Sequence, residues 1–252
     1  MAAINNVWIS SPRSNPQASL RLFCFPFSGS AASVFYSWAS VLPDSIEILP
    51  VQYPGHGTRV GDRLYTDLTE LIQAAKEGLS PYLDKPFAFF GHSMGALVSF
   101  ELARSLQREG APVPQYLFVS GHNAPHLPDT SEQIHLLPEA GFIDKLRTLN
   151  GTPEDVLQNA ELLELILPIL RADFTVCETY RYQPSPAMNV PICACGGLQD
   201  QYTDKEGLEA WRLHTTAGFS VRLFPGDHFY LIPSRMYLLQ VLARELSQVA
   251  TL

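Results

Sequence analysis

Residues 87–109 read FAFFGHSMGALVSFELARSLQRE, and this stretch decides the fold. The apolar run at 87–90 predicts a buried strand, and 94–109 carries apolar residues at helical spacing. The junction, GHSMG at 91–95, matches G-x-S-x-G, a strand–turn–helix motif that raises a serine above the edge of a sheet. Its two glycines allow strand and helix to approach without Cβ clashes. The pattern predicts Ser93 as an exposed nucleophile, with an ordinary helix N-cap as the alternative.

Outside this stretch, strand-like and helix-like segments alternate along the chain. Apolar strands that alternate with helices imply an α/β fold, a mostly parallel sheet covered by helices on both faces. A length of 252 residues is compatible with a single domain, 1–252. The other strand-like segments are 20–25, 46–53, 115–121, 190–197 and 220–226, and the other helix-like segments are 33–42, 67–83, 204–217 and 235–249.

Residues from about 126 to 189 break this alternation, because they contain no convincing strand. Several short helices are predicted here, separated by Pro138, Gly151, Pro153 and Pro168. The segment is too long for a connecting loop in a compact domain. We expect an inserted helical lid over the strand ends, and helices packed on the side of the sheet are the alternative.

Charge and composition exclude several classes of function. The net charge of −8 argues against nucleic-acid binding, which needs a basic surface, and against docking on an anionic membrane. The first residues lack the basic and apolar regions of a secretory signal, and the apolar stretches are too short to span a bilayer. The four cysteines have no further soft ligands near them in the sequence. We therefore expect structural thiols, no metal site and a cytoplasmic protein.

A serine hydroxyl needs a base to become a nucleophile, and the sequence offers several histidines. His228 is best placed, because it follows a strand-like run in a loop that can reach over the sheet toward Ser93. His56 and His122 also follow strand-like segments and stay possible. The sequence therefore predicts His228 as the general base.

An orienting carboxylate is the third requirement of such a site. Asp200 follows a strand-like run through a glycine turn, and it comes after Ser93 and before His228 in the chain. This order of serine, aspartate and histidine is that of the α/β-hydrolases. Asp227, next to the histidine in sequence, and Asp173, in the predicted lid, are the rivals.

The tetrahedral intermediate of acyl transfer needs backbone N–H donors for its oxyanion. One should be the N–H of Met94, directly after the serine. The other should come from the loop FPFSGSAAS at 25–33, where Phe27 is our candidate and small residues let the backbone approach a substrate. A simple flexible turn is the competing interpretation of this loop.

Six motifs together resemble one family, and the resemblance runs through nearly the whole chain. They occur in the order and at the spacing of the type II thioesterases, the free-standing editing enzymes of polyketide, nonribosomal peptide and fatty acid synthesis. The motifs are FCFPFSGSAASVF (23–35), VQYPGHGTR (51–59), KPFAFFGHSMGALVSFELAR (85–104), LPILRADF (167–174), GGLQD (196–200) and PGDHFYL (225–231).

That resemblance implies an α/β-hydrolase fold, a triad of Ser93, Asp200 and His228, and an oxyanion hole formed by Phe27 and Met94. It implies hydrolysis of acyl thioesters on the phosphopantetheine arm of an acyl or peptidyl carrier protein that belongs to a synthase. No metal or cofactor of its own is expected, since the phosphopantetheine belongs to the partner. A monomer is the default state.

The sequence departs from the family at two places. His56 stands where the family has an arginine directly after the Pro-Gly pair, with Arg59 following shortly after. The loop at 25–30 reads FPFSGS, where the family commonly has P-x-A-G-G. Backbone donors survive such side-chain changes.

Two other functions stay possible, because a fold does not fix a substrate. The same triad suits a carboxylesterase or lipase that acts on free esters. A hydrolase-fold receptor that binds a ligand without catalysis is the third possibility, although sensing alone would not need all three triad residues.

Overall fold

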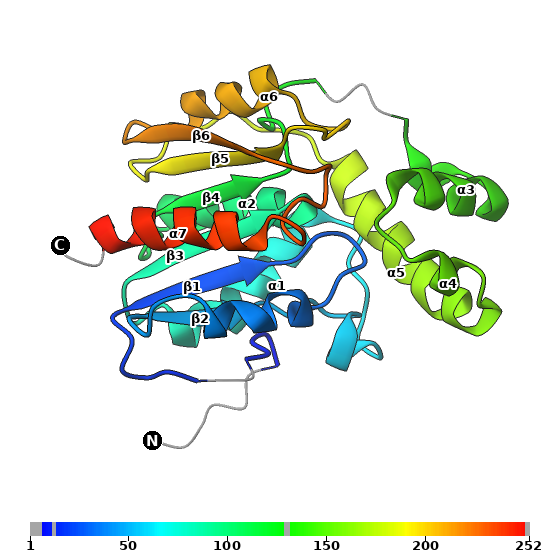
Figure 1. Cartoon of the computed structure of the whole chain (residues 1–252), viewed down its shortest axis with the longest axis horizontal. Coiled ribbons are helices and arrows are strands. Elements are labelled where there is room, and N and C mark those ends of the chain that lie inside the picture. The colour runs from blue at the N-terminus through cyan, green and yellow to red at the C-terminus, as the bar shows by residue number, and fades with distance from the viewer. Residues whose placement is uncertain (1–6, 12–13, 129–131, 250–252) are drawn as a thin grey trace.

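Six strands form one sheet in which every neighbouring pair is parallel, in the order β2-β1-β3-β4-β5-β6 (Figure 1). The computed structural model describes residues 7–11, 14–128 and 132–249. The expectation that no secretory signal opens the chain therefore falls largely outside the described residues, as does a short piece of the predicted lid. The strands are β1 (Leu20–Phe25), β2 (Ile46–Pro50), β3 (Phe87–His92), β4 (Leu117–Ser120), β5 (Ile192–Gly197) and β6 (Phe219–Phe224).

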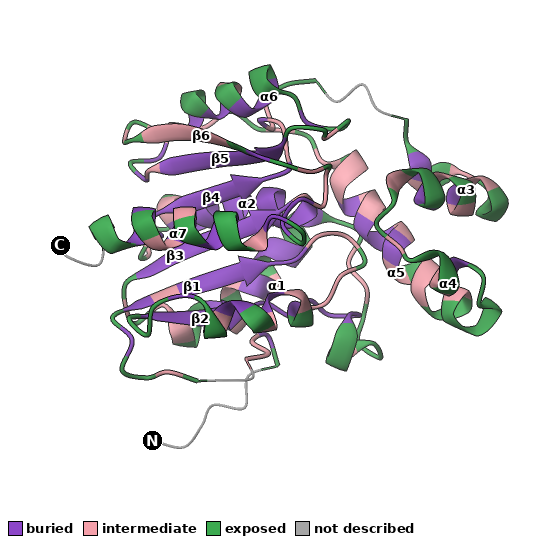
Figure 2. Ribbon diagram, in the orientation of Figure 1, coloured by how far each residue is buried: buried purple, intermediate pink, exposed green. Residues whose placement is uncertain are grey.

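Helices cover both faces of this sheet, because the side chains of each strand alternate between them. Phe23 and Phe25 of β1 belong to the core on one face, whereas Leu22 and Cys24 belong to the core on the other. The central strands between the two layers are buried along their length (Figure 2). The predicted fold class is confirmed. The first face carries α1 (Leu68–Leu79), α2 (Met94–Arg108) and α6 (Lys205–Glu209), and the second carries η1 (Ala32–Ser40) and α7 (Arg235–Val249).

A group of helices between β4 and β5, here called the helical insert (Ile134–Thr179), extends beyond the carboxyl ends of the strands (Figure 1). It has a small core of its own, in which Phe142 and Leu146 pack with Leu170. Its elements are η4 (Ile134–Leu136), α3 (Glu139–Leu149), α4 (Glu154–Leu157) and α5 (Ala160–Thr179).

The prediction that Pro168 separates two short helices is wrong. Helix α5 runs for 20 residues with Pro168 inside it. A proline removes one backbone hydrogen bond from a helix. The contacts that α5 makes in the core of the helical insert keep the helix continuous across that gap.

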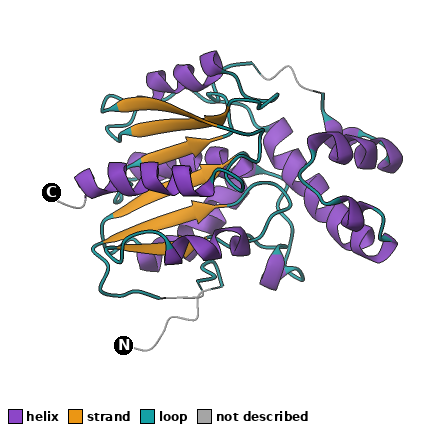
Figure 3. Cartoon of the chain, in the orientation of Figure 1, coloured by secondary structure: helices purple, strands orange, loops and turns teal. Residues whose placement is uncertain are grey.

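Two other segments are helical where a helix was predicted, but they are wholly or partly 3₁₀ helix. The helix predicted at 33–42 is the 3₁₀ helix η1, and the helix predicted at 204–217 is α6 followed by the 3₁₀ helix η5 (Ala210–His214). The short 3₁₀ helix η2 (Gly57–Arg59) lies between β2 and α1, and η3 (Ser80–Tyr82) follows α1 directly; Figure 3 shows helices, strands and loops in separate colours. No helix in the described residues is long and apolar enough to cross a membrane.

Candidate active site

Ser93 stands at a strained turn between β3 and α2. Its backbone has φ 54° and ψ −119°, a conformation that a residue with a side chain rarely adopts and that costs about 1–3 kcal/mol. Its N–H donates to the carbonyl of Ser120 at 2.8 Å, which ties the turn to the end of β4. The side chain makes no capping hydrogen bond to α2, so the interpretation of Ser93 as an ordinary N-cap is wrong.

The two glycines of the motif are required by close backbone approach. A Cβ on Gly91 would lie 2.0 Å from the carbonyl oxygen of Gly95. A Cβ on Gly95 would lie 2.1 Å from the carbonyl oxygen of Phe25, at the end of β1. Real Cβ atoms do not approach oxygen so closely, and the predicted packing of strand against helix is therefore confirmed.

His228 and Asp200 form a hydrogen-bonded pair across the ends of two neighbouring strands. Asp200 follows β5 and His228 follows β6, and Nδ1 of the imidazole lies 2.9 Å from Oδ2 of the carboxylate. The rivals are engaged elsewhere: Asp227 accepts the N–H of Phe229, and Asp173 faces His56. The structure thus brings together the histidine and the carboxylate that the sequence favoured.

The surroundings of Asp200 hold its carboxylate in place and in the ionised form. Its side chain is fully buried, and Oδ2 also accepts a 2.6 Å hydrogen bond from Thr203 Oγ1. Oδ1 accepts the N–H groups of Tyr202 and Thr203 at 2.9 and 3.3 Å. Burial raises the pKa of Asp200, but His228, Thr203 and the Tyr202 N–H together lower it below its ordinary value.

Thr203 is a site residue that the sequence reasoning missed. Its hydroxyl and its N–H both bind the carboxylate three residues earlier in the chain. The signal available in the sequence was the D-x-x-T spacing, since aspartate and threonine commonly hydrogen-bond nearby backbone groups in turns.

The imidazole of His228 lies over His92, the residue directly before Ser93. Their ring centroids are 5.0 Å apart. His92 is fully buried, and its Nδ1 lies 2.8 Å from Ser120 Oγ, which in turn lies 2.6 Å from the hydroxyl of Tyr230. Burial, then the charge of His228, lower the pKa of His92 well below its ordinary value, so this ring stays neutral beneath the site.

The loop after β1 lies beside the serine turn, because β1 and β3 are neighbours in the sheet. The ring of Phe27 meets His92 edge-on at 5.7 Å and Phe229 at 5.2 Å, measured between centroids. The Ser30 N–H donates to the Phe27 carbonyl at 3.0 Å and closes a tight turn. Met94 opens α2, where the first backbone N–H groups have no partner within the helix.

The other candidate bases have hydrogen-bond partners of their own. His56 is buried against Asp173, and Nδ1 of His122 lies 2.6 Å from the carbonyl of Asn123. In the described part of the chain, no three His, Cys, Asp or Glu side chains gather in a way that could hold a metal ion. None of the four cysteines, all of which lie in the described residues, forms a disulfide bond.

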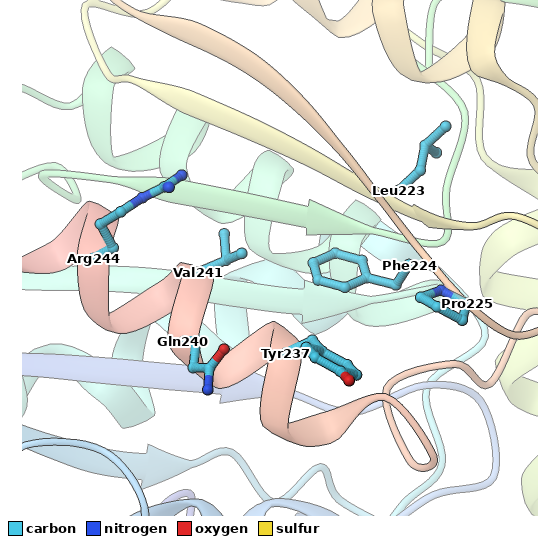
Figure 4. A pocket seen from close by; sticks show the side chains of 7 residues that line it. All are labelled: Leu223, Phe224, Pro225, Tyr237, Gln240, Val241 and Arg244. Carbon is cyan, nitrogen blue, oxygen red and sulfur yellow. The ribbon is translucent and has the colours of Figure 1, made fainter.

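A pocket of about 270 Å³ adjoins the site. Phe27 and Phe229 line it on the side of the sheet, and residues of the helical insert, from Arg147 to Glu154, line it on the other. A larger pocket of about 490 Å³ lies between β6 and α7 (Figure 4). None of the triad candidates lines either pocket, but Phe229, which lines the smaller one, packs edge-on against His228, and we therefore associate the smaller pocket with the chemistry.

A parallel sheet with a strained serine turn after a central strand, β3, and a histidine–aspartate pair after the last two strands of the order, β5 and β6, defines an α/β-hydrolase. The family model described as the thioesterase domain matches residues 20–246. This chain belongs to the thioesterase family, whose members are hydrolases that act on thioester bonds.

Relatives and solved structures support a narrower assignment. The chain is 44% identical over 244 residues to gramicidin S biosynthesis protein GrsT of Aneurinibacillus migulanus, across 97% of this chain and 95% of that protein. It is 46% identical over 238 residues to linear gramicidin dehydrogenase LgrE of Brevibacillus parabrevis, across 93% of this chain and 90% of that protein. The type II thioesterase BorB from the borrelidin biosynthetic cluster matches with a TM-score of 0.86 and 37% identity, over 94% of this chain and 97% of that chain. The predicted resemblance to type II thioesterases is confirmed.

Proposed function

We propose that this thioesterase releases acyl groups from the phosphopantetheine arm of an acyl or peptidyl carrier protein, with Ser93 as the nucleophile. The observation that carries the proposal is the His228–Asp200 pair, 2.9 Å apart, beside the strained turn of Ser93. A synthase as the partner is supported by the names of GrsT, a gramicidin S biosynthesis protein, and BorB, a type II thioesterase of a biosynthetic cluster.

The base is prepared by its hydrogen bond to the carboxylate. Because ionised Asp200 only accepts, Nδ1 of His228 carries the proton and donates to it. Nε2 then has a free lone pair, which takes the hydroxyl proton of Ser93 as the oxygen attacks the thioester carbonyl. The negative charge of Asp200 stabilises the imidazolium that forms.

The oxyanion that develops in this step is stabilised by backbone N–H groups of Phe27 and Met94. Collapse of the tetrahedral intermediate breaks the carbon–sulfur bond and leaves an acyl group on Ser93. The sulfur, whose thiol has a pKa of about 8.5, needs little acid help to leave, and it carries away the proton that His228 took from Ser93, so that the imidazole is neutral again. Water, deprotonated by His228, then attacks the acyl-enzyme, and the serine regains its proton as the free acid departs.

The helical insert acts as the lid of this site in our proposal. The support is the pocket of about 270 Å³, which lies between the insert and the aromatic rings of Phe27 and Phe229. A site closed between two such surfaces suits an acyl chain or the thin pantetheine arm. No metal or organic cofactor takes part in any step, and the phosphopantetheine arrives with the carrier protein.

We further propose that the enzyme works as a monomer in the cytoplasm. The support for the compartment is that none of the four cysteines forms a disulfide bond, which is typical of proteins in a reducing environment. The net charge of −8 supports a protein that binds neither nucleic acid nor an anionic membrane.

The proposal is tested with Ser93→Ala and an acyl-carrier protein as substrate, by following loss of the acyl group. We expect turnover to fall by at least about a thousandfold, because the residual rate comes from binding and the oxyanion hole alone. Ser99→Ala is the matched control, since Ser99 is a buried serine within α2 whose hydroxyl donates to the carbonyl of Ala96. Full turnover by Ser93→Ala would exclude the serine mechanism.

Two alternatives are separated by the choice of substrate. A carboxylesterase would prefer a short aryl ester over the carrier thioester of the same acid, and a receptor would bind the acyl group without turnover. The dehydrogenase in the name of LgrE finds no support in the loop after β1, which reads FPFSGSAAS rather than the G-x-G-x-x-G of a dinucleotide site.

A further inference from the structure

A buried ion pair joins the helical insert to the loop after β1. Asp173 of α5 has a side chain that is 6% exposed, and its Oδ2 accepts two hydrogen bonds. One comes from the N–H of Gly29 at 2.7 Å, and the other from Nε2 of His56 at 2.9 Å. Three segments that are far apart in the sequence thus meet at one carboxylate oxygen.

The partners of His56 require the charged form of its ring. Nδ1 lies 3.0 Å from the carbonyl oxygen of Pro54, which only accepts, so this nitrogen carries a proton. Nε2 faces the carboxylate of Asp173, which also only accepts, so this nitrogen carries one too. Burial lowers the pKa of His56, but the hydrogen bond and charge of Asp173, with the carbonyl of Pro54, outweigh burial and leave that pKa raised.

Gly29 anchors the loop after β1, which carries the proposed oxyanion donor, to Asp173. It has φ +73°, and a Cβ there would lie 2.4 Å from Cδ2 of Leu170, so the loop rests against α5 with no room for a side chain. Gly29 lies inside the tight turn that the Ser30 N–H closes on the Phe27 carbonyl. A shift of Gly29 would therefore move Phe27, the proposed oxyanion donor.

We propose that His56 and Asp173 are positioning residues, a buried ion pair that holds the turn from Phe27 to Ser30 so that the Phe27 N–H meets the oxyanion. This inference rests on the proposed function, because it assumes that the Phe27 N–H binds the oxyanion. Neither residue touches the substrate. They act through Gly29.

Loss of a proton from His56 removes the positive charge that faces Asp173. One ring nitrogen then presents a lone pair to an oxygen that only accepts, the carbonyl of Pro54 or the carboxylate of Asp173, and the hold on the carboxylate and on Gly29 weakens. Other ionisable groups surround the pair: Tyr53 meets His56 edge-on and is kept protonated by burial, Cys177 lies one turn beyond Asp173 on α5, and Arg59 is paired with Asp62. Since arginine stays protonated at any working pH, an arginine at position 56 preserves the cation where histidine loses it.

The first experiment compares Asp173→Asn with the wild type on a soluble acyl-pantetheine thioester. We expect kcat to fall about tenfold to a hundredfold with little change in KM, because a misplaced oxyanion donor weakens binding of the transition state but not of the substrate. Glu178→Gln is the matched control. Glu178 is a carboxylate of the same helix that binds His135 and two backbone N–H groups, but its partners lie within the helical insert.

The control separates positioning from stability. Both variants are expected to lower the melting temperature, and only Asp173→Asn is expected to lower kcat. Equal effects of the two variants on kcat, or no effect of Asp173→Asn, would overturn the proposal.

The second experiment follows kcat against pH for the wild type and His56→Arg. The wild-type kcat is expected to decline at alkaline pH toward the Asp173→Asn value, and His56→Arg to keep its rate over the same range. Coincident profiles would overturn the proposal even if Asp173→Asn failed to fold. The outcome is distinct from failure of the proposed function, which is decided separately by Ser93→Ala with the acyl-carrier protein as substrate.

Discussion

Thr203 Oγ1 donates a 2.6 Å hydrogen bond to Asp200 Oδ2, the same oxygen that lies 2.9 Å from Nδ1 of His228. One carboxylate oxygen therefore receives both the imidazole and the hydroxyl. The hydroxyl fixes the direction in which Asp200 presents its charge, and this direction sets the orientation of the ring of His228.

Replacing Thr203 by Val should therefore slow catalysis while leaving the carboxylate in place. Valine keeps the branched shape but has no hydroxyl, so Asp200 loses one of its hydrogen bonds and gains freedom to rotate. We expect kcat to fall about tenfold, in line with the loss of one hydrogen bond to a charged group. Thr203→Ser should restore most of the rate, and a Val variant as fast as the wild type would show that the hydroxyl is dispensable.

Asp200→Asn should have a larger effect, because an amide holds the wrong tautomer of His228 as well as losing the charge. We expect kcat for thioester hydrolysis to fall by roughly 10³–10⁴. Asp227→Asn is the control, since this neighbouring carboxylate accepts only the N–H of Phe229 in the hydrogen bonds of the site. Similar losses for the two variants would contradict the assignment of Asp200.

Gly121→Ala should damage both stability and activity. Gly121 has φ +60°, and a Cβ there would lie 2.6 Å from Cε1 of His92 and 3.2 Å from Cε1 of His228. Gly110 offers a matched comparison, because it has φ +65° but a Cβ would meet nothing within 4 Å. In denaturant unfolding, Gly110→Ala should cost about 1–2 kcal/mol with kcat unchanged. Gly121→Ala should cost more and lower kcat, and equal behaviour of both would refute the crowding argument.

The stability of the fold should fall in mild acid because His214 is buried as a neutral ring. Burial, then the charges of His126 and Arg104, lower the pKa of His214 from 6.5 to about 4. A folded-state pKa below the unfolded value means that the unfolded chain binds the proton first. The contribution of His214 is therefore intact above pH 6.5 and lost as the pH falls toward 4.

His214→Gln tests this contribution through melting temperatures measured between pH 8 and 4.5. The variant is expected to be less stable than the wild type at pH 8, because packing against Phe100 and Trp211 is lost, and the gap should narrow as the pH falls. A gap that is constant with pH would show that His214 does not resist protonation in the folded protein.

Local patterns predicted the fold well where an element is bounded by its own residues. The strand predicted at 20–25 and the helix predicted at 235–249 agree with β1 and α7 at both ends. The prediction failed at Pro168, because the local rule for proline takes no account of the contacts that keep α5 continuous. Tertiary packing there outweighs one missing backbone hydrogen bond.

For the site as well, local patterns predicted some features and tertiary contacts created the others. The strained turn of Ser93 follows from five consecutive residues. Asp200 was favoured because it follows a strand-like run through a glycine turn, since chain order alone fits Asp173 and Asp227 as well. His56 and Asp173 are 117 residues apart in the chain, and no local sequence pattern predicts a contact over that separation. Only the folding of α5 against the loop after β1 creates it.

The proposed catalytic imidazole is positioned by the least buried strand of the sheet. His228 follows β6, the last strand in the order, and the side chains of β6 are mostly half-buried, unlike those of β3, which are buried throughout. An edge strand opens at a lower free energy than the core it borders. Inactivation should therefore precede global denaturation. In a urea titration, we expect turnover to disappear while most of the far-UV circular dichroism signal remains, because β6 opens before the rest of the sheet unfolds.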